Sequence, residues 1–587
     1  NINIKTEKMK RTTLISVAIA SVMSAVATNS FGNTVVPSAA QKEISTGDNV
    51  TYNATRGTTF DDSWKKPDYS KKFQEGKFFY YVISEAQKTV GVAPYSGIDN
   101  VYQHSMEVPE TITHGGSTYT VVAIGRVAFA NMFNLQSVKL PKTIQYIGQG
   151  AFWGASILKM EIPDATEEID DRCFKDAIKL GSIKLGKGLT KIGEGAFSGC
   201  WDIKEIIVAD GNKAFSNRDG ALYTKDESTV IKYPSYRKDV TKVVLPSTVK
   251  KIEEGAFEFC EYLTEITLNE GLKEIASTAF YFCKSLESMK IPASVDKIAN
   301  GSTFCLLEKC KKFEVAEGNT TYEALMNGRL LADKKTHTAV SLLYTKELDP
   351  ITIPEGIEHI GNKAMVMFYE NEYMEQVYRG KGPREVILPT TLKSIEAYAF
   401  SGANIHSIKV PDAVETIATG AFQDCKRLNY VEIGKGCKNV GDFVFSSCDA
   451  LATKGKGIIR VYAEIPPKVQ DTEGKAVNFD DDLVKGAQLQ VPEASLSQYK
   501  EASAWKKFRQ IVKLEGLSAK EVENESLVLM PSAGVLRIQN PEANQVNLYS
   551  LNGYLLHSTS ETAFSVELST GIYLVSSNGK TQKVYIP

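Results

Sequence analysis

Apolar residues recur along most of the chain in a fixed order, separated by constant numbers of polar residues. The recurring phrase is Ile-Gly-x-x-Ala-Phe-x-x-Cys-x-x-Leu, and a short segment of alternating apolar and polar residues follows it. Within each run of copies the Phe returns every 22 to 24 residues. A period of this length predicts a solenoid, because a single rung cannot bury its apolar face without a neighbour. The recurring positions are Phe129, Phe152, Phe174, Phe197, Phe257, Phe280, Phe304, Phe400, Phe422 and Phe445.

The rung from Leu245 to Leu268 shows how this pattern predicts local structure. The segment 266–268 alternates as a short strand does, with two side chains turned inward and Thr267 turned outward. Phe257 is expected to fill the interior of the rung, and Ala256 beside it permits a close approach of the backbone. We therefore predict a mainly β fold in which each rung contributes a short strand.

These repeats resemble the BspA-like subclass of leucine-rich repeats, which occurs in surface proteins of Bacteroidetes and of some eukaryotic parasites. The resemblance covers more than half of the chain. It implies a curved, right-handed solenoid with a parallel sheet along one face and short helical or 3-10 turns. It also implies a surface adhesin that binds host extracellular proteins or other bacteria.

The repeat pattern is interrupted three times, and the first two interruptions are alike. The spacing of the aromatic slot rises to 60 residues after Phe197 and to 61 residues after Phe304. Both extra segments begin with an acidic residue, Gly and Asn, and continue through a turn that contains Gly. We expect a structural β-hairpin island in each of them, at residues 209–243 and 316–350.

The third interruption, at residues 366–383, is longer than a rung requires and rich in aromatic residues. Four aromatic residues with Arg and Gly on one loop have the composition of a protein-binding surface. The alternative is a loop that folds back and buries its rings against its own rungs. Its candidate partner-binding residues are Phe368, Tyr369, Tyr373, Tyr378 and Arg379.

The outward positions of the predicted strands form a second candidate surface. Their middle is apolar or neutral with Lys on both sides, which is how many protein interfaces are built. The alternative is an ordinary solvated sheet face whose charges limit aggregation. The outward residues are Lys139, Glu161, Lys184, Ile207, Val244, Thr267, Lys290, Glu314, Thr352, Ile387, Lys409 and Glu432, and the candidate partner-binding residues among them are Lys184, Ile207, Val244, Thr267 and Lys290.

The cysteines follow the repeat. Five of the nine lie three residues after the recurring Phe, and Cys310 and Cys437 occupy slots where other rungs place Leu or Val. We expect buried thiols that pack as small apolar side chains. The alternative is a disulfide between stacked residues such as Cys260 and Cys283.

Composition and charge exclude several classes of function. The 70 acidic and 68 basic residues give a net charge of −2, so no large basic field attracts nucleic acid. The six His residues lie in no zinc-protease motif, and the acidic pair Asp170-Asp171 and run 480–482 lack the spacing of a calcium loop. We therefore predict no catalytic residues, no metal and no cofactor.

The segments outside the repeats complete the predicted organisation. Lys10 and Arg11, the apolar stretch 14–26 and the small residues 25–27 are typical of a secretory signal. The expected divisions are an upstream translation artefact (1–8), a signal peptide (9–27), a flexible linker (28–75), a β-rich N-terminal cap (76–120), the repeats (121–455), a C-terminal cap (456–516) and a small β-sandwich (517–587).

The C-terminal β-sandwich is similar to the sorting domain of the type IX secretion system of Bacteroidetes. That resemblance implies passage through the outer membrane, followed by surface attachment or release. The sequence departs from the family pattern, because no Pro-Asn-Pro lies near Met530 and the end, 585–587, is not rich in Lys. A β-module that is retained in the mature protein is the alternative.

The sequence as a whole predicts a secreted or cell-surface binding protein without catalytic activity. Its expected partners are extracellular proteins or glycans rather than nucleic acid. We expect a monomer whose mature chain has no transmembrane segment and is associated with the outer membrane or released. The alternative is an envelope enzyme, or an accessory component that captures glycans or peptides.

Overall fold

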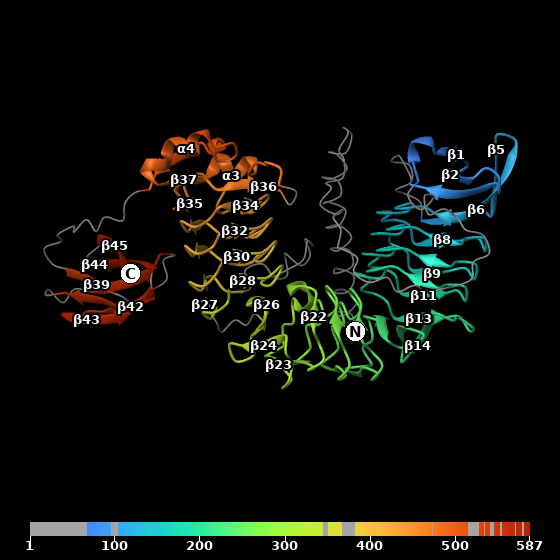
Figure 1. Cartoon of the computed structure of the whole chain (residues 1–587), viewed down its shortest axis with the longest axis horizontal. Helices are drawn as coiled ribbons and strands as arrows, with labels where there is room; N and C mark the ends of the chain where they lie inside the picture. Colours follow the sequence, from blue (N-terminus) through green and yellow to red (C-terminus); the bar gives the residue numbers. More distant parts are fainter. Residues whose placement is uncertain are drawn as a thin grey trace, which may run out of the picture.

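The computed structural model describes residues 67–94, 104–343, 350–366, 382–471 and 474–514, and in the C-terminal part residues 528–532, 535–540, 545–551, 555–569, 571–577 and 580–586. These residues form an arc of stacked rungs and a further group of C-terminal strands (Figure 1). The predicted fold class is confirmed, because strands dominate and the helices are few and short. The predicted upstream segment, signal peptide and linker up to residue 66 lie outside the described residues. The first described element is the 3-10 helix η3 (Tyr69–Lys71).

Each rung places a strand on one sheet, which we call the face strand. Most neighbouring face strands pair in parallel and in register, so equivalent positions stand side by side. The face strands are β4 (Ser105–Glu107), β7 (Ser137–Lys139), β9 (Lys159–Glu161), β11 (Ser182–Leu185), β13 (Glu205–Val208), β17 (Lys242–Val244), β19 (Glu265–Thr267), β21 (Met289–Ile291), β23 (Phe313–Val315), β27 (Ile351–Thr352), β29 (Val386–Ile387), β31 (Ser407–Val410), β33 (Tyr430–Ile433), β35 (Ile458–Val461), β37 (Gln488–Val491) and β38 (Gln510–Lys513).

A second, shorter strand of each rung, the return strand, lies before the turn that carries the recurring Phe. These strands also pair in parallel, so the solenoid has two sides that carry strands, each divided into several sheets. The return strands are β6 (Ser117–Ile124), β8 (Tyr146–Ile147), β10 (Glu168–Ile169), β12 (Lys191–Ile192), β18 (Lys251–Ile252), β20 (Glu274–Ile275), β22 (Lys297–Ile298), β28 (His359–Ile360), β30 (Ser394–Ile395), β32 (Thr416–Ile417), β34 (Asn439–Gly441) and β36 (Lys468–Gln470). The hairpin strand β5 (Thr111–His114) pairs with β6, and the 3-10 helix η5 (Gly301–Phe304) forms one turn.

The recurring Phe side chains stack on one another in the core. The rings of Phe129, Phe152 and Phe174 are nearly parallel, with centroids 5.2 Å and 5.3 Å apart. Phe257 and Phe280 repeat this arrangement at 5.4 Å in a later run of rungs. Because all these rings are buried, each one covers apolar surface of both neighbours, as a solenoid core requires.

The two islands divide the solenoid into three blocks, each with its own apolar core. Each block opens with a three-stranded antiparallel meander whose third strand pairs in parallel with the first return strand of the block. The meander at the N-terminus therefore has the same topology as the two islands. The meander strands are β1 (Phe73–Glu75), β2 (Phe78–Ser84) and β3 (Thr89–Ala93); β14 (Phe215–Arg218), β15 (Ala221–Thr224) and β16 (Thr229–Lys232); and β24 (Tyr322–Leu325), β25 (Leu330–Asp333) and β26 (Thr338–Leu342).

A buried Asn attaches each island to the rung before it. The Asn212 amide donates to the carbonyls of Gly186 and Leu189, at 2.9 Å and 3.0 Å. Its oxygen accepts the N–H groups of residues 214 and 215. Asn319 makes the same four bonds in the second island. The acidic-Gly-Asn sequence that opens both islands is thus a structural attachment of the meander.

At the first island, the turns of two rungs meet although an island separates them in sequence. The Glu258 carboxylate accepts hydrogen bonds from the Ser198 hydroxyl at 3.0 Å and the Gly199 N–H at 2.7 Å. Lys232, at the end of β16, is also buried and donates to the Gly255 carbonyl at 2.8 Å. Burial raises the pKa of Glu258 to about 7, although the nearby Lys232 ammonium opposes that shift.

At the second junction the rungs approach each other closely through their backbones. Gly301 donates its N–H to the Asn362 carbonyl at 3.0 Å. A Cβ atom at Gly301 would lie 2.1 Å from the carbonyl oxygen of Lys363, so only Gly fits there. The two junctions therefore have the same topology, with different residues making their closest contacts.

The nine cysteines are buried free thiols, as the repeat position predicts. Four of the five that lie three residues after the Phe donate to the Phe carbonyl of the preceding rung, for example Cys283 to Phe257 at 3.0 Å and Cys200 to Phe174 at 3.1 Å. Burial raises the pKa of Cys200 to about 12. The thiols therefore act as rung-to-rung contacts in the core.

Short helices close the last rung. Tyr499 and Trp505 are buried there, and they donate to the carbonyls of Ala463 at 2.8 Å and Pro467 at 2.7 Å. Their apolar rings therefore cover the end of the third core, and their polar atoms are satisfied by its last loop. The helices are α3 (Asp481–Gly486), η6 (Glu493–Ser495), α4 (Leu496–Glu501) and η7 (Trp505–Lys507).

The C-terminal strands form two antiparallel sheets around a small apolar core. One sheet has the order β39-β40-β43 and the other β42-β41-β44-β45. Leu536, Ile538, Leu548 and Val575 are buried between them. The strands are β39 (Val528–Ser532), β40 (Val535–Gln539), β41 (Val546–Ser550), β42 (Leu555–Thr559), β43 (Ala563–Glu567), β44 (Gly571–Ser577) and β45 (Lys580–Ile586).

Candidate binding surface

The face strands turn alternate side chains outward. Lys184, Thr267 and Lys290 are exposed, and Ile207 and Val244 are 39% and 73% exposed. Ile207 lies on β13 and Val244 on β17, on the two sides of the first island, where the described strands share no ladder. The five candidate residues on these strands therefore all present side chains to solvent.

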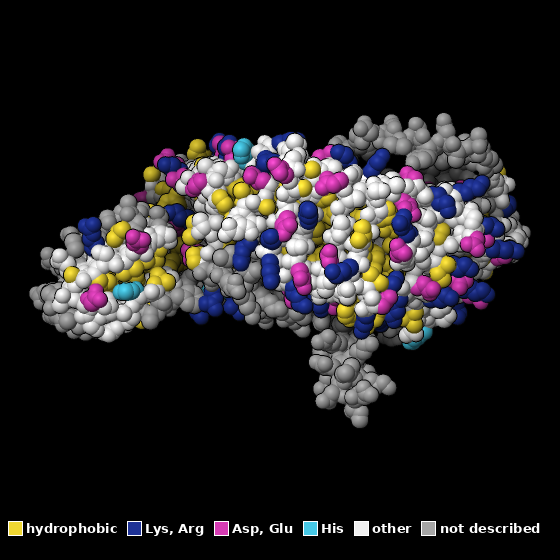
Figure 2. Space-filling view, turned by 90° about the horizontal axis from the view of Figure 1, so that it is seen from below, with side chains coloured by type: hydrophobic (Ala, Val, Ile, Leu, Met, Phe, Trp, Pro, Cys, Tyr) yellow, Lys and Arg dark blue, Asp and Glu magenta, His cyan; other side chains and the backbone are white. Residues whose placement is uncertain are grey.

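Most charges along this row of side chains are paired locally. Lys159 lies 3.0 Å from Glu161, and Lys242 lies 2.6 Å from Glu265 on the next strand. Such exposed pairs contribute at most about 1 kcal/mol each. The face shown in Figure 2 likewise mixes Lys and Arg with Asp and Glu and carries no large field of one sign. This surface is suited to a partner without a strong net charge.

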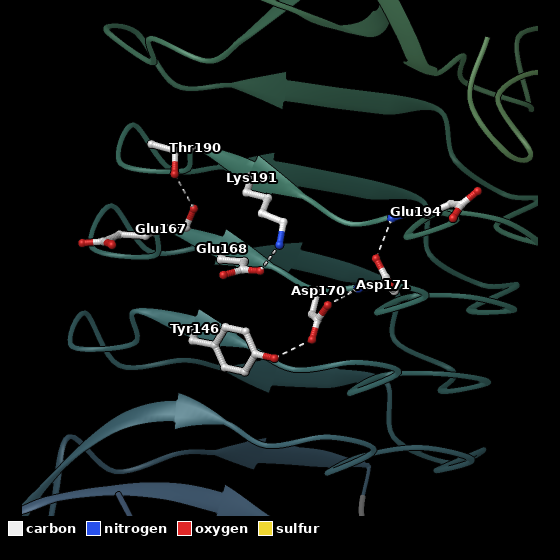
Figure 3. Close-up of polar contacts among 8 residues, drawn as sticks. All are labelled: Tyr146, Glu167, Glu168, Asp170, Asp171, Thr190, Lys191 and Glu194. Carbon is white, nitrogen blue, oxygen red and sulfur yellow. Dashed lines mark hydrogen bonds and ion pairs between the residues drawn. The ribbon is translucent and has the colours of Figure 1, made fainter. Parts of the chain in front are cut away.

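The acidic residues near the return strands hold rungs together. In Figure 3 the Lys191 ammonium points to Glu168, and the Tyr146 hydroxyl donates to Asp170. The Lys191 ammonium lies 2.6 Å from the Glu168 carboxylate. Asp171 accepts a backbone N–H of the next rung at 2.8 Å. Burial and the neighbouring Asp170 raise the pKa of Tyr146. Across the described part of the chain, no group of three or more His, Cys, Asp or Glu residues is placed to hold a metal ion.

The face strands of the third block carry a polar network that the sequence did not indicate. Tyr430 and Tyr462 both donate to one oxygen of Glu432, Tyr462 at 3.4 Å. Arg460 lies 3.6 Å from the same oxygen and donates to Gln490 at 2.7 Å. The Arg460 guanidinium also lies 5.5 Å from the centre of the Tyr430 ring. Neutral and charged side chains thus form one connected group.

Glu432 corrects an expectation from the sequence. It stands at an outward strand position, as predicted, but only 8% of its surface is exposed, because Tyr430, Arg460 and Tyr462 surround it. Glu314 and Ile387, also in the outward row, are half-buried. The row of outward residues predicted from the sequence ends at Glu432. Continuing it to the next two strands adds Arg460, opposite Glu432, and then Gln490, opposite Arg460.

A groove of about 1800 Å³ runs along these face strands of the third block. Ile387, Lys409, Tyr430 and Tyr462 line one side of it. Residues of the C-terminal strands, with Tyr573 among them, line the other side. Burial raises the pKa of the Tyr430 hydroxyl, which keeps it neutral and able to donate.

A separate apolar group lies outside the core of the second block. Two residues after the recurring Phe, the backbone is left-handed, and most rungs place Gly, Asn, Asp or Ser there. Phe259, Phe282 and Leu306 occupy this position with φ of 61°, 61° and 62°. They pack with Trp201 and with Val366, the first residue of the aromatic insertion.

The other candidate residues from the sequence, Phe368, Tyr369, Tyr373, Tyr378 and Arg379, lie outside the described residues. Of the helices in the described part of the chain, none has the length and apolar character needed to cross a membrane.

Comparison with known sequences identifies the repeats. Six copies of the BspA type leucine rich repeat region match residues 108–219, 230–326 and 371–454. This part of the chain belongs to the BspA-type leucine-rich repeat family. The breaks between the matched BspA-type segments overlap the two island meanders, where β15 and β25 replace the repeat pattern. The BspA-type match indicates no catalytic family.

Solved structures of similar proteins are also leucine-rich repeat proteins. A leucine-rich repeat protein from Eubacterium ventriosum shares 21% identity, covering 60% of this chain and 93% of its own, with a TM-score of 0.39. A leucine rich cell surface protein from Faecalibacterium prausnitzii shares 18% identity over 76% and 96%, with a TM-score of 0.34. A leucine-rich repeat protein from Bacteroides ovatus shares 18% identity over 68% and 99%, with a TM-score of 0.30. No match was found among curated proteins.

Proposed function

We propose that this protein is a secreted or cell-surface binding protein, adhesin-like and without catalytic activity, that uses the outward side of its face strands to hold a protein or glycan partner. The observation that carries the proposal is the exposed apolar pair Ile207 and Val244, flanked by exposed Lys184 and Lys290. Exposed apolar side chains with a polar surround are typical of interfaces.

The repeat family and the predicted leader support this function. BspA-type repeats build an extended surface, which suits binding a large partner better than enclosing a small substrate. The signal peptide expected at 9–27 would export the chain. The C-terminal strands, if they act as a type IX sorting domain, would attach it to the outer membrane or release it.

The aromatic insertion is a second proposed contact. Phe368, Tyr369, Tyr373, Tyr378 and Arg379 have the side chains that most often dominate binding energy at interfaces. Val366, where the insertion begins in the sequence, packs in the apolar group with Phe259 and Phe282.

The test uses surface plasmon resonance. The purified full chain is immobilised, and individual extracellular matrix proteins and bacterial surface proteins are passed over it. We expect at least one specific partner. The double variant Ile207→Glu/Val244→Glu should bind it at least about tenfold more weakly, because charge would be buried at the contact. Val82→Glu, which changes an apolar side chain of similar exposure (38%) on β2, is the matched control and should bind normally.

Two further variants separate the proposed contacts. Deletion of residues 368–382 tests the insertion, and Lys184→Glu/Lys290→Glu tests the charged flanks of the face. Equal capture by the wild type and all three variants would eliminate both surfaces. Failure to capture any purified partner would contradict the binding function itself.

A further inference from the structure

The third block differs from the other two in how its outward residues are held. In the first two blocks, outward residues such as Glu161 and Lys290 are exposed. In the third block, Glu432 and Arg460 are 8% and 5% exposed and are tied to each other and to Gln490. A face that serves only solubility leaves its charges in water, because burying a charge is unfavourable unless it is fully paired.

The network fixes two tyrosine rings at the groove. Glu432 and Arg460 lie opposite each other on neighbouring strands. Tyr430 lies two residues before Glu432 in the chain, and Tyr462 lies two residues after Arg460, so both take outward positions next to this pair. Both hydroxyls donate to Glu432, and both rings remain half-buried in the groove wall. Side chains that are held in place before binding lose less entropy when a ligand arrives.

The size and lining of the groove narrow the class of ligand. Its volume of about 1800 Å³ exceeds the ~300–1,000 Å³ of ordinary small-molecule sites, which favours an extended ligand. Five acidic and four basic residues line it, so it has no strong field for a polyanion or polycation. The charged residues are Glu355, Glu385, Asp412, Glu432 and Glu464, with Lys409, Lys435, Lys438 and Lys468, and the tyrosines are Tyr430, Tyr462, Tyr573 and Tyr585.

We propose that this groove binds a neutral oligosaccharide. The flat, partly apolar faces of sugar rings stack on tyrosine rings, and sugar hydroxyls donate to carboxylates and accept from ammonium groups. The groove supplies both kinds of contact along one extended path. This inference rests on the proposed binding function and adds to it a second site, with its own ligand class, away from Ile207 and Val244.

The test is isothermal titration of the full chain with neutral oligosaccharides of at least four residues: α- and β-glucans, mannan, galactan, xylan and chitin fragments. Tyr430→Ala, Tyr462→Ala and Tyr585→Ala should each weaken binding about tenfold or more; Tyr585 lines the groove and is 39% exposed. Tyr430→Phe keeps the ring and should stay within about threefold of the wild type. Tyr236→Ala removes a half-buried tyrosine of the second block and is the matched control, expected to bind normally.

Each other outcome would overturn the inference. The first is that no neutral oligosaccharide binds at about millimolar concentration. The second is that acidic oligosaccharides or peptides bind more strongly than neutral ones. The third is that any of the three Ala variants binds as well as the wild type. If the groove binds no sugar while the Ile207→Glu/Val244→Glu variant still loses its protein partner, only this inference fails. If the chain binds neither sugar nor protein, the proposed function fails with it.

Discussion

The carboxylate of Glu258 accepts a hydrogen bond of 2.7 Å from the backbone N–H of Gly199, a residue 59 positions earlier in the chain. At the equivalent position of a regular rung, this N–H donates to a carbonyl of the next rung, as Asp176 does to Ser198 at 2.8 Å. The island removes that carbonyl, and Glu258 takes its place. A titratable side chain therefore substitutes for a backbone group at the junction of the first two blocks.

This substitution predicts a pH-dependent stability. Burial raises the pKa of Glu258 from an ordinary 4.5 to about 7, so the folded chain retains this proton over a range where the unfolded chain loses it. Stability should therefore fall as the pH rises from about 4.5 to 7, by at most about 3 kcal/mol. Burial also raises the pKa of nearby Asp176, which acts in the same direction. Urea unfolding at pH 5 and pH 8 measures the difference.

The variant Glu258→Gln is the matched control for this effect. Its amide is neutral at every pH and still offers an oxygen to Gly199 and Ser198. We expect it to resemble the wild type at pH 5 and to be more stable than the wild type at pH 8. A wild-type stability that rises between pH 5 and 7, with no change in the variant, would contradict the assignment.

Removing either island Asn should destabilise the adjacent block. Asn212→Ala removes the side-chain partner of two N–H groups and of two carbonyls, of which the Gly186 carbonyl keeps only a 3.4 Å bond from the Leu189 N–H. Asn319→Ala removes the same four bonds in the second island. Each variant should lose about 2–4 kcal/mol of unfolding free energy in urea. Asn269→Ala removes two donated bonds at a half-buried site and should lose about 1 kcal/mol. Equal losses in all three variants would show that the islands are not attached in this way.

The nine thiols should be unreactive in the folded protein. They are buried, several donate to carbonyls, and burial raises the pKa of Cys200 to about 12, so little thiolate exists. A colorimetric disulfide reagent should label none of them within minutes in buffer and all nine in strong denaturant. Rapid native labelling, or a native mass that shows a Cys260–Cys283 disulfide, would be the contrary result.

The stacked phenylalanines should be the costliest single sites. Phe280 lies between Phe257 and Phe304, at 5.4 Å and 5.9 Å between ring centres. Phe280→Ala should destabilise the second block by about 3–5 kcal/mol in urea unfolding. Phe443→Ala changes an aromatic residue that is 54% exposed and should stay within about 0.5 kcal/mol of the wild type. Similar losses of unfolding free energy in both variants would contradict a stabilising role of the ring stack.

Some features of the two binding surfaces can be predicted from sequence periodicity, and others depend on how the rungs pack. The outward positions of Lys184, Ile207 and Val244 follow from alternation within a strand, and alternation is a local property. The burial of Glu432 depends on Arg460 and Tyr462, which arrive from the next strand, and on the size of their side chains. No single rung contains that information.

The sequence alone determined that the chain is a repeat solenoid, which side chains of a face strand point inward, and that the cysteines belong to the core. These properties follow from a period of 22 to 24 residues and from contacts between equivalent positions. Only the tertiary structure decided that each island is a three-stranded meander that begins a new core, and that Glu258 replaces a missing carbonyl. Both depend on groups about 60 residues apart in the chain, which meet only because the rungs stack.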